Sequence, residues 1–327
     1  MAAGMESLRV SAILRTYNRG YILGEALASA LGQTCQAFEI VVVDDGSTDD
    51  TAEVVCRSRA GNLKYVRHER NRGVAAAANS GIQAASGNVL AFLDSDDLWK
   101  PAMLQRLTSF LSRHPDAGAV FCDAELIGGH EVVPSLIAVM NCFPRLLRDR
   151  ARHNEHLISA REMYLCLLEE VPAKPSTMLI RREVIDRVGF FKEAWRSGED
   201  WELFLRMSRS CDFGFIDEVL VTQRVGADST FLKFAEQDKQ FLLDLFLAEK
   251  AALLNDPAGT EAVNRGIAMC CRELGLRHLL AGRRGQSAAA YWRGFLQTRR
   301  LPMLLRLASV AMPVGVRQRL RRAIKGG

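Results

Sequence analysis

Short hydrophobic runs alternate with amphipathic stretches along the first third of the chain. Residues 10–14, 38–43 and 90–93 are apolar, partly β-branched runs with the length of buried strands. The first two are each followed by a polar turn and a helical pattern, over residues 21–31 and 51–59. This alternation with short loops predicts an α/β fold with a doubly wound, mostly parallel sheet flanked by helices.

The pattern becomes less regular after residue 111. Residues 127–159 lack a clear period and contain Pro134 and Pro144, which is typical of a long functional or mobile loop. Further elements are predicted on either side of it: strands at 64–67, 119–123, 176–180, 213–216 and 219–222, and helices at 74–85, 103–111, 160–170 and 182–188.

From residue 231 onward the pattern is helical, with breaks expected at 255–259 and 281–285. We therefore divide the chain into an α/β domain at residues 1–229 and an all-helical, basic C-terminal region at residues 230–327. No Asp or Glu follows Glu273, whereas many Arg residues do. The apolar side of these helices could pack on the α/β domain or lie on an anionic membrane surface, and the sequence leaves both open.

Three carboxylates follow the strand at residues 90–93, namely Asp94, Asp96 and Asp97. Carboxyl ends of strands are where open α/β sheets bind ligands, and three clustered negative charges repel one another without a cation. Mg²⁺ or Mn²⁺, held by one or two carboxylates and completed by water and phosphate oxygens, would relieve that repulsion. The alternative is a solvated acidic turn in which Asp97 caps the helix at 103–111.

Two more acidic pairs stand at element ends. Asp44 and Asp45 follow the strand at 38–43, where Gly46 permits a tight turn. Capping by the residues after Gly46 explains part of this segment but not the two aspartates. Glu199 and Asp200 begin a helical pattern, so stabilisation by the helix dipole is the alternative to a catalytic role for them.

The chain has eight cysteines without Cys-x-x-Cys spacing, so neither a zinc site nor a disulfide framework is indicated. No signal-peptide pattern is found at the N-terminus, and the longest apolar stretch, residues 301–316, is interrupted by Pro302, Arg306 and Pro313. We therefore expect a cytoplasmic protein, peripheral at the inner face of the membrane if the basic helices bind lipid.

Taken together and in order, these segments resemble the inverting glycosyltransferases of family 2, which have the GT-A fold. The resemblance covers residues 10–224. It is carried by Ser11-Ala12-Ile13-Leu14-Arg15-Thr16-Tyr17-Asn18, Val43-Asp44-Asp45-Gly46-Ser47-Thr48-Asp49, Asn71-Arg72-Gly73, Asn79-Ser80-Gly81-Ile82, Phe92-Leu93-Asp94-Ser95-Asp96-Asp97 and Gly198-Glu199-Asp200-Trp201.

The resemblance implies a GT-A-like catalytic domain at 1–229 that binds a nucleoside-diphosphate sugar, with UDP favoured. By that resemblance Asp45 accepts a hydrogen bond from the nucleotide base, with Thr16 and Tyr17 in the same pocket. Asp94 lies near ribose or sugar hydroxyls, and Asp96, with Asp94 beside it, binds Mg²⁺ or Mn²⁺. The other positions assigned to the donor are Arg15, Asn71, Gly73 and Ser95.

The resemblance also implies that Asp200, helped by Glu199, is the general base that takes the proton of the acceptor hydroxyl. A divalent ion held by Asp96 would stabilise the charge that develops on the departing diphosphate. A single in-line displacement inverts the anomeric configuration. The acceptor is expected to be a glycan or a lipid-linked glycan of surface polysaccharide synthesis, and no nucleic-acid partner is expected.

The sequence departs from the family in two places. Ala78 precedes Asn79, where the family often has a basic residue. Gly226 occupies the position where many members have a His that helps bind the metal or diphosphate. Arg224, Asp228 or a residue of the loop at 127–159 could take its place, or the metal could bind only together with the sugar nucleotide.

Two other functions stay open. A sugar-1-phosphate nucleotidyltransferase shares such a sheet but normally begins with a Gly-rich loop, and residues 15–19 offer none. A non-catalytic sugar-nucleotide-binding scaffold would be favoured by the loss of Asp96 or Asp200, and both are present. Release of nucleoside diphosphate from a sugar nucleotide distinguishes an enzyme from a scaffold.

Overall fold

The computed structural model describes residues 7–58, 60–128, 131–148, 153–195, 198–225 and 230–311. The chain divides into two compact units, Met1–Lys233 and Phe234–Gly327. The boundary predicted from the sequence lies after residue 229.

A single mixed sheet forms the centre of the first unit, with strand order β3-β2-β1-β4-β9-β6-β10-β5 among the described residues. Two short strands lie off this path, where β7 pairs with β6 and β8 pairs with β10. The strands are β1 (Val10–Thr16), β2 (Glu39–Asp44), β3 (Leu63–Arg67), β4 (Val89–Asp94), β5 (Leu98–Trp99), β6 (Ala117–Gly128), β7 (Glu131–Val133), β8 (Glu155–Ile158), β9 (Met178–Arg181) and β10 (Asp212–Arg224).

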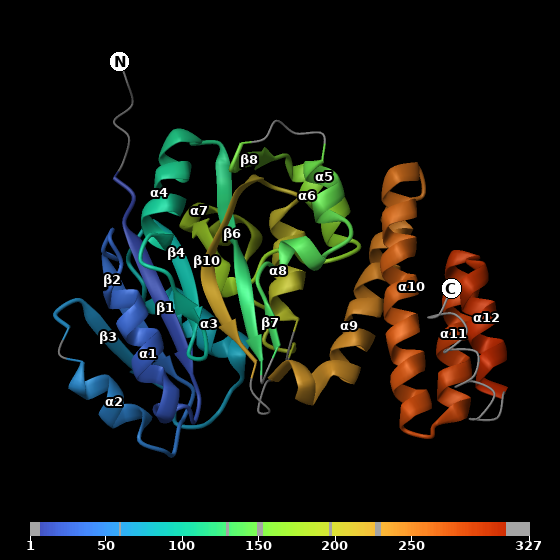
Figure 1. Ribbon diagram of the computed structural model, residues 1–327, viewed down its shortest axis with the longest axis horizontal. Coiled ribbons are helices and arrows are strands. Elements are labelled where there is room, and N and C mark those ends of the chain that lie inside the picture. The colour runs from blue at the N-terminus through green and yellow to red at the C-terminus, as the bar shows by residue number, and fades with distance from the viewer. Residues whose placement is uncertain are drawn as a thin grey trace. The chain divides into compact units, whose positions relative to one another are not determined.

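Helices cover both faces of this sheet (Figure 1). In β1, Ala12 and Leu14 belong to the same apolar core as Leu27 of α1 and Leu107 of α4. Ile13 points to the opposite face, where a Cβ added to Gly81 of α3 would lie 2.3 Å from its Cγ2 atom. The helices are α1 (Gly20–Leu31), α2 (Thr51–Arg57), α3 (Val74–Ala84), α4 (Met103–Arg113), α5 (Phe143–Leu147), α6 (Ala160–Leu167), α7 (Arg182–Val188) and α8 (Glu199–Met207).

The predicted α/β class is confirmed, and the structure adds detail to its second half. Strands β3, β2, β1 and β4 are parallel, whereas β9 runs antiparallel to both β4 and β6. The strands predicted at 213–216 and 219–222 are in fact one strand, β10. It stays paired with β6 across register shifts between Ile216 and Val221, because the polar residues there form a bulge and not a turn.

The prediction of an irregular loop is wrong for much of the segment at residues 127–159. It contains the end of β6, β7, a 3₁₀ turn at Ile137–Val139, α5 and β8. A cluster of aromatic rings packs α5 onto the sheet: the ring centroid of Phe143 lies 5.4 Å from that of Phe121 and 5.0 Å from that of Phe215. Tertiary packing of this kind orders short elements that a periodic pattern does not show.

The second unit is helical, as predicted, and consists of the part of α9 (Thr230–Ala252) from Phe234 on, α10 (Pro257–Leu280), α11 (Arg284–Thr298) and α12 (Leu301–Ala311). The break expected at 255–259 is partly wrong, because Pro257 and Gly259 lie in the first turn of α10, capped by Asp256. A further break, at Arg299, was not predicted. No helix among the described residues is long and apolar enough to cross a membrane.

Candidate functional site

The carboxyl ends of β1, β2 and β4 meet at one edge of the sheet. In the strand register Thr16 is opposite Asp44, and Arg15 is opposite Asp94. The chain continues this alignment past the strands: the N–H of Asp45 donates to the carbonyl of Thr16 (2.9 Å), and the N–H of Ser95 donates to the carbonyl of Arg15 (3.2 Å). Residues far apart in the sequence are therefore brought together where open α/β sheets bind ligands.

Asp45 is buried and holds the turn before α3. Its Oδ1 atom accepts a hydrogen bond from the N–H of Arg72 (2.8 Å), and its Oδ2 atom accepts one from the N–H of Gly73 (2.7 Å). Nδ1 of His68 lies 2.6 Å from the same Oδ1, and Nε2 of His68 lies 2.8 Å from the hydroxyl of Ser80. The structure thus joins Asp45 to Gly73, and it adds His68, which the sequence analysis missed.

His68 could have been found from its position, because it directly follows β3 at the same sheet edge. Of the other predicted donor-site residues, Thr16 is buried beside Asp45. Tyr17 is exposed at 44%, and Asn71 is also exposed, so both side chains are accessible from solvent.

Asp44 has a structural task. Its carboxylate accepts hydrogen bonds from the N–H of Ser47 (2.8 Å) and from the hydroxyl of Tyr65 (2.6 Å), and it is completely buried. These bonds close the tight turn at Gly46, whose φ is 80°. The two neighbouring aspartates therefore differ: Asp44 fixes the turn, and Asp45 reaches the adjacent loop.

Two arginines offset part of the negative charge of the acidic cluster after β4. Nε and Nη2 of Arg15 donate to Oδ1 of Asp94 (2.9 and 2.6 Å), and Arg19 forms an ion pair with Asp96. Burial, and then the charge of Asp94, raise the pKa of Asp96. Burial and the charges of Asp94 and Asp96 raise the pKa of Asp97 to about 7. The cluster therefore carries more negative charge than its burial favours.

The alternative that Asp97 caps the following helix is wrong. Helix α4 begins at Met103 without a side-chain cap, and Oδ2 of Asp97 instead accepts a hydrogen bond from Nε2 of Gln223 in β10 (3.2 Å). This bond connects the acidic turn after β4 to β10, which β9 and β6 separate from β4 in the sheet.

Asp94 and Asp96 fit the requirements of a hard divalent cation, because both offer carboxylate oxygens and repel each other without one. Within the described part of the chain, no three of the acidic residues at this edge bring ligand oxygens within 4.8 Å of one another. Asp94 and Asp96 would hold an ion here together with diphosphate oxygens and water, the ligand set that Mg²⁺ prefers. It would compete with Arg19 for Asp96.

Arg15 connects the acidic cluster to the start of α8. The guanidinium is 4% exposed, and its Nη1 atom lies 3.7 Å from Oε1 of Glu199, too far for a hydrogen bond. The negative charge of Asp200 also favours the charged form of the Arg15 guanidinium. The three carboxylates Asp94, Glu199 and Asp200 therefore surround one buried cation.

Glu199 and Asp200 have different surroundings. Burial and the charge of Asp200 raise the pKa of Glu199 to about 8, and the opposing attraction of Arg15 is too weak to reverse this because Arg15 is hydrogen-bonded to Asp94. Asp200 is partly exposed, and its Oδ1 atom accepts the N–H of the next residue, Trp201 (2.8 Å). Glu199 is therefore the carboxyl of the pair that its surroundings dispose to hold a proton.

We expect Glu199→Gln to make the protein more stable at alkaline pH. The pKa of Glu199 is 4.5 without the fold and about 8 within it, so its protonated form stabilises the native state below pH 4.5, and this contribution is lost as the pH rises towards 8. Gln keeps the neutral shape at every pH. The melting temperature should fall less between pH 6 and pH 9 for the variant than for the parent, by the equivalent of roughly a few kcal/mol in the free energy of unfolding. The same fall in both proteins would show that Glu199 is ionised in the native state.

Arg224, at the end of β10, lies against the acidic turn. Its Nε atom donates to the carbonyl of Asp96 (2.6 Å), and its Nη1 atom donates to Glu25 of α1 (2.6 Å). Gly226 and Asp228, which the sequence analysis considered for the same task, lie outside the described residues.

Three buried donor atoms at this edge have no hydrogen-bond partner among the described residues: Nη1 of Arg15, Oγ1 of Thr16 and Nη2 of Arg224. A buried donor without a partner costs about 1–3 kcal/mol. Two of them belong to guanidinium groups, which match phosphate oxygens in shape and charge. Their arrangement around Asp94 and Asp96 is that of a site for a polar, anionic ligand.

The sequence profile described as "Glycosyl transferase family 2" matches residues 11–189, more than half of the chain. The chain belongs to this family. The family 2 match includes β1, β2, β4 and the acidic turn, and it ends before α8.

Curated relatives agree with the assignment to family 2. An uncharacterized glycosyltransferase of Nostoc, alr2836, is 36% identical over 126 residues, which are 38% of this chain and 39% of the relative. WfgD of Escherichia coli, a UDP-Glc:α-D-GlcNAc-diphosphoundecaprenol β-1,3-glucosyltransferase, is 31% identical over 134 residues, 41% of this chain and 53% of WfgD. The aligned part of the chain thus spans between about two fifths and about half of the length of these relatives.

Solved structures show the same fold for this family 2 chain. S. aureus TarS in complex with UDP-GlcNAc has a TM-score of 0.61 at 18% identity, over 89% of this chain and 92% of that one. The mannosyltransferase PcManGT of Pyrobaculum calidifontis, in complex with GDP-Man and Mn²⁺, has a TM-score of 0.56 at 21% identity, over 94% and 80%. Both likenesses confirm a GT-A architecture.

Proposed function

We propose that this protein is an inverting glycosyltransferase that moves a sugar from a nucleoside-diphosphate sugar to an acceptor hydroxyl. The observation that carries the proposal is the group of three buried donor atoms at the carboxyl edge of the sheet, one each on Arg15, Thr16 and Arg224, that have no hydrogen-bond partner within the described ranges. A diphosphate supplies the acceptor oxygens that these groups lack.

Each residue has a distinct task in the proposed reaction. Asp45 accepts a hydrogen bond from the nucleotide base, for which its Oδ2 atom keeps a free lone pair beside the bond from Gly73. A divalent ion bound through Asp96 and Asp94 would stabilise the negative charge that develops on the departing diphosphate. Arg224 binds the same diphosphate from the side of β10, in the place of the His that many family members have.

Asp200 is the general base in this proposal. It is the accessible carboxylate of the pair at the start of α8, and it takes the proton of the acceptor hydroxyl as that oxygen attacks the anomeric carbon. Arg15 and the protonated Glu199 help to position Asp200. Attack opposite the leaving diphosphate inverts the configuration and needs no covalent sugar–enzyme intermediate.

We favour a UDP-sugar as donor and a lipid-linked glycan of surface polysaccharide synthesis as acceptor. The support comes from relatives: WfgD is named for transfer from UDP-Glc to a diphosphoundecaprenol-linked sugar, and TarS was solved with UDP-GlcNAc. PcManGT, solved with GDP-Man, makes GDP-sugars the next donors to test.

The proposal is tested by release of nucleoside diphosphate. The purified chain is incubated with UDP-, GDP- and dTDP-sugars and Mn²⁺, with and without a lipid-linked glycan acceptor, and free nucleoside diphosphate is measured. We expect one donor to be consumed at a rate that the acceptor increases. A donor that raises the melting temperature but releases no diphosphate would instead support the non-catalytic scaffold.

We further propose that α11 and α12 bind an anionic membrane surface. Leu301 and Leu305 lie one helical turn apart on α12 and are 63% and 64% exposed. Leu296 of α11 and the exposed Arg299 and Arg306 are near them in sequence. Exposed apolar side chains with neighbouring arginines are typical of a helix that lies in the lipid headgroup region. Such a position would give access to a lipid-linked acceptor.

Replacing both Leu301 and Leu305 by Ser should weaken binding to phosphatidylglycerol vesicles by about tenfold or more, because two leucines no longer enter the lipid. Co-sedimentation at low salt measures the effect. Leu254→Ser is the matched control, since Leu254 is 78% exposed in the same unit but precedes α10. Equal binding of the double variant and the parent would show that these helices only pack within the protein.

A further inference from the structure

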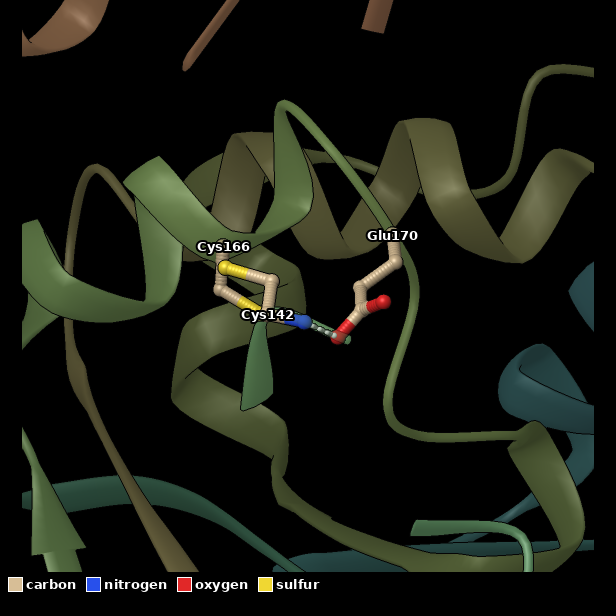
Figure 2. A group of neighbouring side chains, drawn as sticks. All are labelled: Cys142, Cys166 and Glu170. Atoms are coloured by element: carbon tan, nitrogen blue, oxygen red, sulfur yellow. Dashed lines mark hydrogen bonds between the residues drawn. The ribbon is translucent and has the colours of Figure 1, made fainter. Parts of the chain in front are cut away.

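Two cysteines lie side by side away from the donor site. Cys142 immediately precedes α5, and Cys166 lies in the last turn of α6. Their Sγ atoms and a carboxylate oxygen of Glu170 all lie within 4.8 Å of one another (Figure 2). In the described ranges no other three His, Cys, Asp or Glu side chains bring their ligand atoms so close together.

Glu170 serves the backbone and not the sulfur atoms. Its Oε1 atom accepts hydrogen bonds from the N–H groups of Cys142 and Phe143 (2.6 Å each), and its Oε2 atom accepts one from Asn141 (3.0 Å). In Figure 2 the carboxylate is directed at the backbone nitrogen of Cys142. Two thiols are too few for a four-coordinate structural zinc site. Glu170 instead fixes the turn that presents Cys142 to Cys166.

The two thiols differ in accessibility and acidity. Cys142 is partly exposed, whereas Cys166 is 1% exposed. A hydrogen bond from Cys166 lowers the pKa of the Cys142 thiol, although the neighbouring carboxylates of Glu169 and Glu170 oppose this. The same bond, followed by burial, raises the pKa of Cys166. Because the thiolate is the reactive form, Cys142 is the thiol that an oxidant in solution meets first.

We propose that Cys142 and Cys166 form a redox-active dithiol that hydrogen peroxide converts to an intramolecular disulfide. The Cys142 thiolate attacks a peroxide oxygen, so that an S–O bond forms, the O–O bond breaks and hydroxide leaves to be protonated to water. Cys166 then attacks the sulfur of the Cys142 sulfenic acid. The S–S bond forms, the S–O bond breaks, and the Cys166 proton leaves with the hydroxyl as a second water.

The electrons balance, since the two thiols lose the two electrons that the peroxide gains. The location gives the disulfide a consequence for α8. The carbonyl of Leu167, next to Cys166, accepts a hydrogen bond from Nε1 of Trp201 (2.6 Å), and Trp201 follows Asp200. The S–S bond, about 2.05 Å long, therefore constrains the end of α6 that anchors the start of α8.

The test is a thiol map of the full chain. The reduced protein is treated with a few equivalents of hydrogen peroxide, the remaining thiols are alkylated, and peptides are analysed without reduction. We expect most of Cys142 and Cys166 in one linked species, lighter by two hydrogen atoms than the two peptides. Cys35 and Cys56, whose thiols are exposed, should remain mostly alkylated under the same conditions.

Variants separate the two steps. Cys166→Ala should abolish the link and leave a Cys142 sulfenic acid that dimedone traps, and Cys142→Ser should leave Cys166 unoxidised. Ser is a favoured residue before a helix, so the second variant should fold even if the first does not. Cys56→Ser is the matched control and should still form the link.

Two results would overturn the proposal. One is oxidation of Cys35 or Cys56 at peroxide concentrations that leave the pair reduced. The other is about one zinc ion bound per chain in the purified protein and lost in Cys142→Ser, which would make the pair part of a metal site.

Discussion

Asp200→Asn should lower the rate of sugar transfer by roughly two to four orders of magnitude while the donor still binds, the usual range for losing a general base. Asn keeps the shape of the side chain and the oxygen that accepts the N–H of Trp201. It removes only the ability to take a proton. Transfer rate, donor affinity and melting temperature should be measured on one preparation.

The alternative for Asp200 is stabilisation of α8, and a control in the other unit isolates it. Asp256 caps α10 by accepting the N–H of Gly259 (3.1 Å), so Asp256→Asn makes the same chemical change at the start of a helix in the other unit. It should leave transfer unaffected. If Asp200→Asn transfers sugar at the parental rate, the base must be sought elsewhere, beginning with Glu199.

Asp96→Ala should abolish most of the turnover, by roughly a hundredfold or more, because the charge on the leaving diphosphate loses its stabilisation. The parent should likewise lose activity in excess EDTA and regain it with Mg²⁺ or Mn²⁺. The motivation is the pair Asp94 and Asp96, which repel each other and leave coordination positions open. Initial rates against metal concentration measure both effects.

Arg19 complicates this variant, since removal of Asp96 also breaks its ion pair with Arg19. The double variant Asp96→Ala/Arg19→Ala removes the arginine charge as well and should be as inactive as the single one. Asp116→Ala, an exposed carboxylate before β6, is the control for loss of an acidic side chain. Full activity of the parent in EDTA would refute the metal assignment, whatever the variants show.

The sequence was sufficient for the parallel half of the sheet because its strands are continuous apolar runs that each end in a polar turn. That pattern also placed Asp45 and Asp94 at one edge, since parallel strands present their carboxyl ends together. Sequence could not show what the arginines do there. The contact of Arg15 with both Asp94 and Glu199 joins parts of the chain that only the folded sheet brings together.

The second half was harder for a physical reason. Elements such as β7, β8 and α5 are too short to show a period. Strand β7 pairs with β6, β8 pairs with β10, and α5 is packed through Phe143 onto Phe121 and Phe215. Cys142 and Cys166 likewise have no recognisable spacing, and their proximity depends on α5 and α6 being folded.

The position of β9 has a consequence for how the chain folds. Strand β9 lies between β4 and β6 in the sheet and is followed directly by α7. In the sequence, however, β9 comes long after β4, so it is synthesised much later. Until it arrives, β4 presents an open edge of unpaired N–H and C=O groups during synthesis, and Asp94 lacks the Ser176 hydroxyl that accepts its N–H (3.2 Å). A chain that ends before residue 178 would therefore retain the parallel strands but leave the edge of β4 unpaired. This truncated chain should aggregate when it is expressed alone.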